Sequence, residues 1–149
     1  MGSPVLGRLD RMSEFSTRYE FVVGVGKIGS SNARRQIAAK CLRAGGALAS
    51  LIASTARVSK FAVIGSGTVV HHGGFVNADA WIGSNCIINS NALVEHDSSV
   101  GSHSHISTGA ILNGNCHVGE DSFVGSRAVL YHNVRLGDRA IVASGRTIR

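Results

Sequence analysis

The chain has 149 residues, of which 44% are hydrophobic, a formal net charge of +6 and three cysteines. Its length fits one ordinary domain, and its hydrophobic content excludes an intrinsically disordered chain. The longest apolar run is too short to span a bilayer, and the polar start does not resemble a signal peptide, so no membrane partner is expected. Cys41, Cys86 and Cys116 form no C-x-x-C motif, and their odd number indicates a reducing, cytoplasmic setting.

The charge is unevenly distributed along the chain. Residues 1–50 contain eight Lys or Arg, residues 61–126 contain none but hold six of the seven histidines, and residues 127–149 contain five arginines. A basic surface of this kind can bind a polyanion. Nucleic acid is not expected as a partner, because the chain has no zinc finger, RNA-recognition signature or interleaved aromatic residues.

In chain order, residues 1–18 are interpreted as an N-terminal tail, whose Met-Gly-Ser start resembles a vector-derived extension. Residues 19–51 predict a partial α/β segment. A strand is expected at 19–23, a helix at 33–44 ended by two glycines, and a further strand at 47–52.

Gly24, Gly26 and Gly29 spell a G-x-G-x-x-G pattern, which suggests dinucleotide binding. A dinucleotide-binding unit also needs a second half and an acid about twenty residues further on. The corresponding stretch, RAGGALAS, has no acid. We therefore favour a tight turn, with the start of the helix available to a sugar-nucleotide phosphate.

From residue 52 onward, every sixth residue is aliphatic without interruption. The seventeen positions are Ile52, Val58, Ile64, Val70, Val76, Ile82, Ile88, Val94, Val100, Ile106, Leu112, Val118, Val124, Leu130, Leu136, Val142 and Ile148. The residue four places later is nearly always small, with Val134 and Arg146 as the exceptions. Glycine also recurs every eighteen residues, at Gly65, Gly83, Gly101, Gly119 and Gly137.

This period predicts a β-helix in which each hexapeptide is a short strand followed by a bend. The aliphatic side chain points inward, and the small residue closes the corner. Three hexapeptides make one coil, so residues 52–149 make about 5.4 coils with parallel strand pairing between them. The expected fold class is all-β, with a parallel β-helix at 52–149 preceded by the partial α/β segment at 19–51.

The residue before each aliphatic should point outward, yet it is usually apolar, as at Ile87 and Phe123. Exposed apolar columns need a cover. Neighbouring prisms packed around a symmetry axis would supply it, and three copies suit a three-sided prism. A homotrimer is therefore expected.

The stretch NALVEHDSSVGSHSHIS (91–107) concentrates candidate catalytic side chains. His96 takes a corner position from which Asp97 can reach back to its imidazole, and an imidazole oriented in this way suits proton removal near neutral pH. An exposed corner histidine is the alternative, because polar residues prevail at that place in the repeat. His105 stands alone in an otherwise apolar column, either as an interface residue or as part of a site.

The sixfold aliphatic period with small residues at the fifth place resembles the hexapeptide-repeat acyltransferases of the left-handed β-helix class. Within that class, residues 19–149 resemble the branch that acetylates nucleotide-linked amino sugars or sialic acids. The resembling stretches include FVVGVG, NARRQI, IGSGTVV and VGEDSFVGS, and the most specific is VEHD…HIS…NG. The resemblance implies an acetyl-CoA-dependent sugar N- or O-acetyltransferase that works as a homotrimer.

The resemblance also implies roles for individual residues. His96 is the general base, Asp97 raises its basicity, and the sugar amine or hydroxyl attacks the thioester directly, without an acyl-enzyme. The acetyl-CoA lies between neighbouring prisms, with two residues at its acetyl end and two along the pantetheine. These are His105 and the backbone near Gly114, and the backbone around Ser126 and Ser144. The acid-rich coils around His96, free of Lys and Arg, suit a cationic amine and favour N-acetylation.

Two departures from the family pattern accompany the resemblance. Only the second half of the expected α/β domain is found, and the usual tail after the last coil is missing. A truncated, non-catalytic trimeric scaffold is therefore the alternative. A metal-dependent enzyme resembling the γ-carbonic anhydrases is less favoured, because the chain has no His-x4-His pair and His103-x-His105 offers too few imidazoles for zinc. No metal site is expected.

Overall fold

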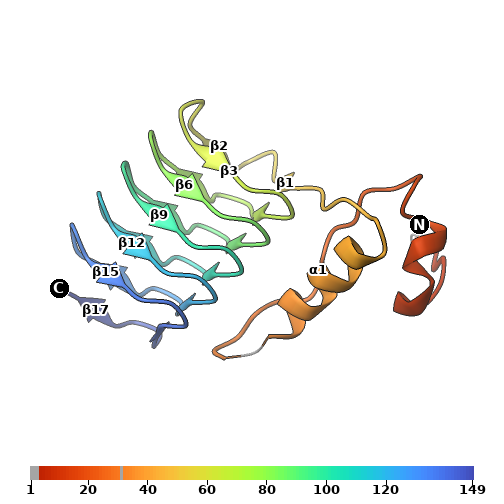
Figure 1. Ribbon diagram of the computed structural model, residues 1–149. Coiled ribbons are helices and arrows are strands. Elements are labelled where there is room, and N and C mark those ends of the chain that lie inside the picture. Colours follow the sequence, from red (N-terminus) through yellow and green to blue (C-terminus); the bar gives the residue numbers. More distant parts are fainter. Residues whose placement is uncertain (1–3, 31) are drawn as a thin grey trace.

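The computed structural model describes residues 4–30 and 32–149, and most of it is a parallel β-helix (Figure 1). Each strand has two residues and pairs in parallel with the strands eighteen residues before and after it. The fold is a left-handed β-helix, which confirms the predicted fold class. The strands are β1 Leu51–Ile52, β2 Arg57–Val58, β3 Val63–Ile64, β4 Val69–Val70, β5 Phe75–Val76, β6 Trp81–Ile82, β7 Ile87–Ile88, β8 Leu93–Val94, β9 Ser99–Val100, β10 His105–Ile106, β11 Ile111–Leu112, β12 His117–Val118, β13 Phe123–Val124, β14 Val129–Leu130, β15 Arg135–Leu136, β16 Ile141–Val142 and β17 Thr147–Ile148.

Three sheets form the sides of the prism, and each side is named here by its first strand. The β1 side contains β1, β4, β7, β10, β13 and β16, the β2 side contains β2, β5, β8, β11, β14 and β17, and the β3 side contains β3, β6, β9, β12 and β15. The chain passes from the β1 side to the β2 side, then to the β3 side and back. Each of the three corners is named by the two sides that it joins.

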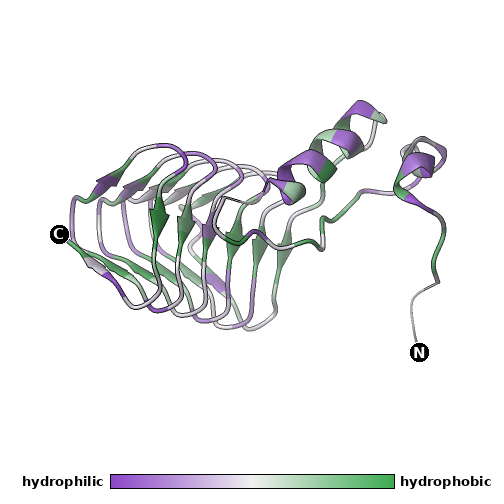
Figure 2. Cartoon of the chain, turned by 90° about the horizontal axis from the view of Figure 1, so that it is seen from below, coloured by the Kyte–Doolittle hydropathy of each residue, from purple (hydrophilic) through white to green (hydrophobic). Residues whose placement is uncertain are grey.

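The predicted aliphatic residue is the second residue of every strand, and it points into the prism. From Val70 to Leu130 these side chains are at most 3% exposed, and Cys86 and Cys116 fill the bore beside them. Figure 2 shows hydrophobic segments recurring from coil to coil along the sides of the prism. Ile52 is 51% exposed because it belongs to the first coil, which no other coil covers. The six-residue period therefore identifies the core correctly, with the end of the stack as the exception.

Corner geometry explains the eighteen-residue glycine period. At the β3/β1 corner successive coils approach closely, and a Cβ on Gly101 would lie 2.5 Å from the backbone nitrogen of Glu120 in the next coil. All three corners also have turns with Asn or Asp residues in the left-handed region, such as Asp97 at φ 59°. Short polar side chains tolerate that conformation better than other side chains do.

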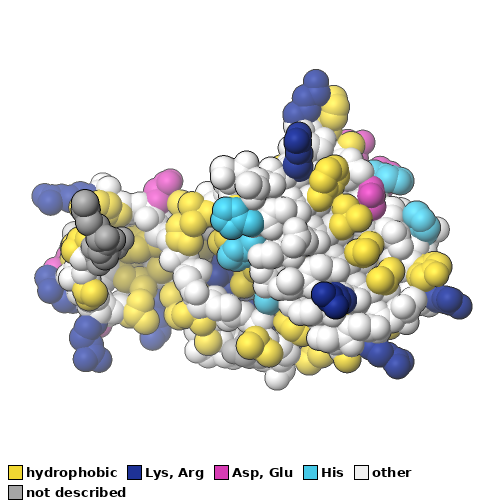
Figure 3. Space-filling model, turned by 180° about the vertical axis from the view of Figure 1, so that it is seen from behind, with side chains coloured by type: hydrophobic (Ala, Val, Ile, Leu, Met, Phe, Trp, Pro, Cys, Tyr) yellow, Lys and Arg dark blue, Asp and Glu magenta, His cyan; other side chains and the backbone are white. Residues whose placement is uncertain are grey.

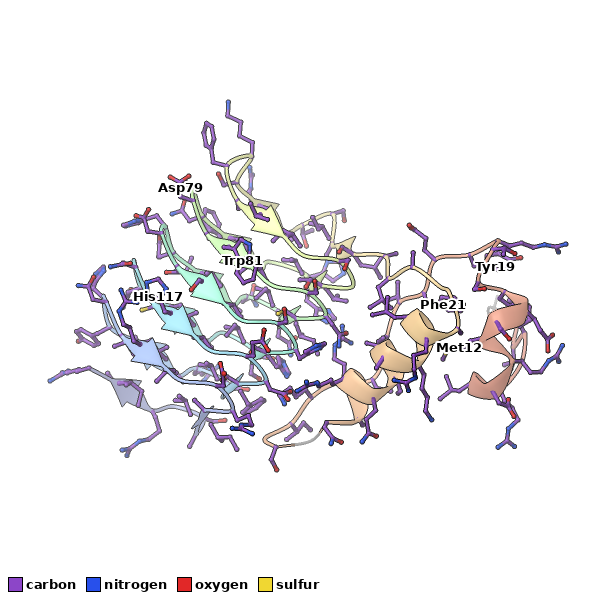
Figure 4. The ribbon with its side chains drawn as sticks, in the orientation of Figure 1. Met12, Tyr19, Phe21, Asp79, Trp81 and His117 are labelled. Carbon is purple, nitrogen blue, oxygen red and sulfur yellow. The ribbon has the colours of Figure 1, made fainter. Side chains whose placement is uncertain are left out.

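The residues before the β-helix form a small second layer from a 3-10 helix, η1 (Leu9–Glu14), and α1 (Ala33–Arg43). An extended segment between them pairs with the chain before β1 through one parallel bridge, Phe21 to Leu48. Within the predicted tail, Met12 of η1 is 7% exposed and belongs to a small core cluster that includes Cys41 and against which Phe21 packs (Figure 4). The vector-like start, residues 1–3, lies outside the described residues.

Buried polar contacts attach this second layer to the β-helix. The Arg34 guanidinium of α1 donates hydrogen bonds to the carbonyls of Val23, Val25, Gly67 and Asn85. Lys27 and Arg35 both pair with the Asp121 carboxylate, at 3.0 and 2.7 Å. Since Gly67, Asn85 and Asp121 all lie at the β3/β1 corner, this corner holds the extended segment and α1 in place.

The apolar column through Ile87 is covered by the chain itself. Ile87 and His105 are 6% and 7% exposed, because residues 22–27 pass over the β1 side. The sequence predicts that a neighbouring chain covers this column. In the structure, residues 22–27 of the same chain cover Ile87 and His105 instead. The β2 and β3 sides keep partly exposed apolar residues, including Phe75 at 39% and Trp81 at 48%. Figure 3 shows hydrophobic side chains scattered among polar ones over the face seen from behind.

Candidate functional site

His96 and Asp97 form a hydrogen-bonded pair at the β2/β3 corner, directly after β8. Asp97 lies in the left-handed region, and its carboxylate reaches back so that His96 Nδ1–H donates to Asp97 Oδ2 at 2.7 Å. This hydrogen bond raises the pKa of His96. Because Nδ1 carries the proton, Nε2 is left as the proton acceptor. Both side chains are more than half exposed, so the pair is open to a substrate.

Gly114 lies one coil further on, directly beside the His96 ring. A Cβ at this position would lie 2.7 Å from Cε1 and 2.8 Å from Nε2 of His96, so the ring occupies the space of a side chain. Within residues 4–30 and 32–149 the Gly114 N–H donates no hydrogen bond, whereas the N–H groups of Asn113 and Asn115 donate to carbonyls of other coils. A free N–H donor beside a basic nitrogen is suited to bind a carbonyl oxygen that develops negative charge.

Two more polar groups surround this point. His132, one coil beyond Gly114, places its Nδ1 3.4 Å from the same Cβ position. Glu95 accepts a hydrogen bond from Asn77 Nδ2 at 2.6 Å, and its charge, after the hydrogen bond and charge of Asp97, also raises the pKa of His96. With no Lys or Arg between residues 61 and 126, the corner has an acidic character that suits a cationic amine.

His105 lies on a different side of the prism from His96. It belongs to β10 on the β1 side, which is opposite the β2/β3 corner of a three-sided prism. Its Nδ1–H donates to the Lys27 carbonyl at 2.5 Å, and its Nε2 accepts from Asn89 Nδ2 at 3.1 Å. Burial lowers the pKa of His105, so this imidazole is held in its neutral form. Within one chain, His105 therefore cannot share a site with His96.

A cavity of about 270 Å³ opens above His105. It lies between the extended segment that contains Gly24 and Gly26 and the β1 side, where Asn89 and His71 line it. A Cβ on Gly24 or Gly26 would meet no atom within 4 Å, so packing within the chain does not require these glycines. Gly24 and Gly26 of the G-x-G-x-x-G pattern therefore line a cavity, and neither of them allows a close approach of two backbone segments.

Ser126 and Ser144 lie at the β1/β2 corner, and the β2 side separates them from Gly114. Strand β14 starts after the Ser126 turn and ends before His132, so it links the two corners. Val129 of β14 and its neighbour Ile111 of β11 point outward and are half-buried, which provides an apolar strip between the corners. Such a strip, with serines at one end and the Gly114 N–H at the other, combines an apolar surface with polar groups at both of its ends.

No group of three or more His, Cys, Asp or Glu side chains in the described part of the chain is arranged to hold a metal ion. All three cysteines are free and buried, and burial raises the pKa of Cys86 to about 11. Such a thiol is inert at neutral pH, in keeping with a filler of the bore. None of the helices in residues 4–30 and 32–149 is long and apolar enough to cross a membrane.

The structure brings together His96, Asp97 and Gly114, and it separates His105 from them. Sequence reasoning left His132 unassigned, although its place in the column of His96 and Gly114 was visible from the eighteen-residue period. Asn77 and Asn89 were missed altogether. Each is the residue directly after an inward aliphatic, a place where no property of the single sequence distinguishes a site residue from ordinary surface.

Comparisons with known proteins agree with this fold. The family model for the bacterial transferase hexapeptide (six repeats) matches residues 115–149. The acetyltransferase domain of PglB from Neisseria gonorrhoeae is 32% identical, with a TM-score of 0.92 over 99% of this chain and 72% of that one. The same domain has been solved in complex with acetyl coenzyme A, with a TM-score of 0.90 at 32% identity over 99% of this chain and 73% of that one.

A second relative comes from Caulobacter crescentus. PerB, solved in complex with CoA and GDP-perosamine, is 31% identical, with a TM-score of 0.88 over 100% of this chain and 72% of that one. No curated protein sequence matches the chain.

Proposed function

Because the chain belongs to the hexapeptide-repeat acyltransferase family, we propose that it transfers an acetyl group from acetyl-CoA to the amine of a nucleotide-linked amino sugar. The observation that carries this proposal is the β2/β3 corner, where the Nε2 of the His96–Asp97 pair lies beside the free N–H of Gly114. The PglB domain bound to acetyl-CoA and PerB bound to GDP-perosamine support both substrates.

In the proposed step, the sugar amine attacks the thioester carbonyl directly and no acyl-enzyme forms. His96 Nε2 takes the proton from the attacking nitrogen, and Asp97 holds the ring in the required tautomer. The Gly114 N–H donates to the thioester oxygen as it gains negative charge. The acidic surroundings of Glu95 and Asp97 favour an amine over a hydroxyl, and so N-acetylation over O-acetylation.

Residues of the β2 side would hold the acetyl-CoA. The backbone around Ser126 and Ser144 would follow the pantetheine, and Val129 would pack against its chain. CoA supplies the activated thioester, while this chain positions the carbonyl and moves the proton. The buried, free cysteines are consistent with a reducing compartment, and we place the reaction in the cytoplasm.

The site is proposed to lie between two chains of a homotrimer. His96 and His105 occupy opposite parts of one prism, so both can face one acetyl group only if they come from neighbouring chains. The β2 and β3 sides keep exposed apolar residues for such packing, and on the β1 side the cavity lined by His105 and Asn89 would have to face the neighbouring chain. In this arrangement Asn89 and His105 of one chain would face the His96 corner of the next.

Two experiments test the proposal. Purified protein with acetyl-CoA and a panel including GDP-perosamine, other nucleotide-linked amino sugars and sialic acid should release CoA and form an N-acetylated sugar, detected by mass spectrometry. If none of these acceptors leads to CoA release, the proposed substrate class is wrong. A trimer that neither binds nor consumes acetyl-CoA would be the scaffold instead.

Mixing two inactive variants tests the shared site. His96→Ala and His105→Ala chains, unfolded and refolded together, should regain about a quarter of the wild-type turnover, because random assembly pairs one intact His96 with one intact neighbouring His105 at that frequency. Mixing that restores nothing, while co-purification through two different affinity tags shows mixed trimers, would mean that the two residues do not meet across chains. A monomer at micromolar concentration would remove the shared site.

A further inference from the structure

His132 shares the space above Gly114 with the proposed base. The residues of this corner stack at intervals of eighteen, as His96, Gly114 and His132, and because the middle residue is a glycine, the His96 ring enters the space of its missing side chain and comes near His132. A single position, that of a Cβ on Gly114, is 2.8 Å from His96 Nε2 and 3.4 Å from His132 Nδ1. Two imidazole nitrogens thus open onto the same small volume from opposite sides.

His96, the Gly114 N–H and His132 differ in whether they can accept or donate a proton. His96 Nδ1 is committed to Asp97, so its Nε2 is the nitrogen that accepts a proton from the attacking amine. The Gly114 N–H is a donor without a partner in the described chain. His132 makes no side-chain hydrogen bond within residues 4–30 and 32–149, and it is exposed, so it can exchange protons with water.

We infer that His132 is a second catalytic residue, which gives the proton of its Nδ1 to the sulfur of CoA as the thioester breaks. The inference rests on the proposed function, because it assigns a role within that reaction. The C–S bond breaks with negative charge building up on sulfur, and a proton donor placed near that sulfur lowers the barrier. One imidazole cannot both take the amine proton and offer another to sulfur at the same moment.

The step balances in atoms and charges. The amine nitrogen forms a bond to the carbonyl carbon, and His96 Nε2 accepts the proton that the nitrogen loses. The C–S bond breaks, its electron pair stays on sulfur, and sulfur takes the proton from protonated His132. The amide and the CoA thiol leave, His96 releases its proton to water, and His132 regains one from water.

The test uses two acetyl donors that differ in the leaving atom. Acetyl-CoA needs a proton on its departing sulfur, whereas the matching selenoester leaves as a selenolate, a much weaker base that needs none. The variant His132→Asn keeps an N–H donor near the position of Nδ1 but cannot transfer a proton. It should lower kcat with acetyl-CoA by about 10²-fold, the usual weight of proton transfer by a positioned side chain, and leave kcat with the selenoester close to wild type.

Two controls separate this role from others. His96→Asn should lower turnover with both donors, because both need deprotonation of the amine. His72→Asn, an exposed corner histidine at the same place of its hexapeptide, should change neither. The inference is overturned if His132→Asn leaves kcat with acetyl-CoA unchanged, reduces both donors equally, or raises only KM, which would make His132 a binding residue. Wild-type protein that transfers acetyl from neither donor would overturn the proposed function and this inference with it.

Discussion

The imidazole of His96 occupies the space that a side chain at Gly114 would need, with its Cε1 2.7 Å and its Nε2 2.8 Å from the position of a Cβ there. Gly114 has no positive φ, so a larger residue meets no backbone strain and its only conflict is with this ring. A glycine is therefore needed here to make room for the His96 ring, and the backbone conformation of the turn does not require one.

The variant Gly114→Ala should consequently fold normally and lose activity. Its methyl group would push the exposed ring of His96 away, and a misplacement of about 1 Å can cost about 10²-fold in rate. Steady-state kinetics and thermal unfolding would be measured together. Gly137→Ala is the matched control, because a Cβ there meets nothing within 4 Å and both properties should stay at wild-type values. An active Gly114→Ala enzyme would contradict the placement of the base.

Removal of the proposed base should have the largest effect. His96→Ala is expected to lower kcat by about 10²–10⁴-fold, as for the loss of a general base, with little change in CoA affinity. Calorimetric titration with CoA checks the affinity, and kinetics with the true acceptor checks the rate. Full activity of this variant would show that another group removes the proton.

Loss of the carboxylate partner should change the pH dependence. Asp97 raises the pKa of His96 through its hydrogen bond, so Asp97→Asn should lower that pKa and weaken the base. The acid limb of kcat/KM should move to lower pH, while the maximal rate falls by less than in His96→Ala. A profile of kcat/KM between pH 5 and 9 tests this prediction, and an unchanged acid limb would mean that Asp97 does not set the basicity of His96.

The inward assignment of the β-helix is tested at β9. Val100 is 0% exposed, so Val100→Asp buries a carboxylate without a partner, at a cost of several kcal/mol. This is a large share of the total stability of a typical domain, and the protein should unfold or fail to accumulate. Ser99→Asp changes the outward neighbour in the same strand and should remain folded. A folded Val100→Asp protein, judged by circular dichroism, would contradict the inward direction.

His105 should make stability fall in acid. Burial lowers its pKa in the folded state below the usual value of about 6.5, so its contribution to stability is present above that value and is lost as pH falls through the folded pKa. Arg34, His71 and Lys27 face the same imidazole and also oppose its protonation. Denaturant unfolding at pH 8 and pH 5.5 should show a larger loss for wild type than for His105→Asn. Equal losses would mean that His105 is not a buried neutral group.

The repeat-level features of this protein could be read from the sequence because they are local and periodic. An aliphatic residue every six places and a glycine every eighteen leave one way to bury the apolar side chains, so the seventeen inward positions and the identity of the strands follow directly. Asp97 could likewise be paired with His96, because a corner brings adjacent side chains together without help from the rest of the chain.

Contacts between distant segments were decided only by the tertiary structure. The sequence could not predict which segment covers the column through Ile87, because the apolar pattern is the same whether residues 22–27 or another chain packs on it. Both nitrogens of His105 are engaged, by the Lys27 carbonyl and by Asn89, and Lys27 is 78 residues away in sequence. The meeting of His96 and His132 above Gly114 depends on the stacking of three coils and on a side chain that is absent, and a missing side chain acquires meaning only when its neighbours in space are known.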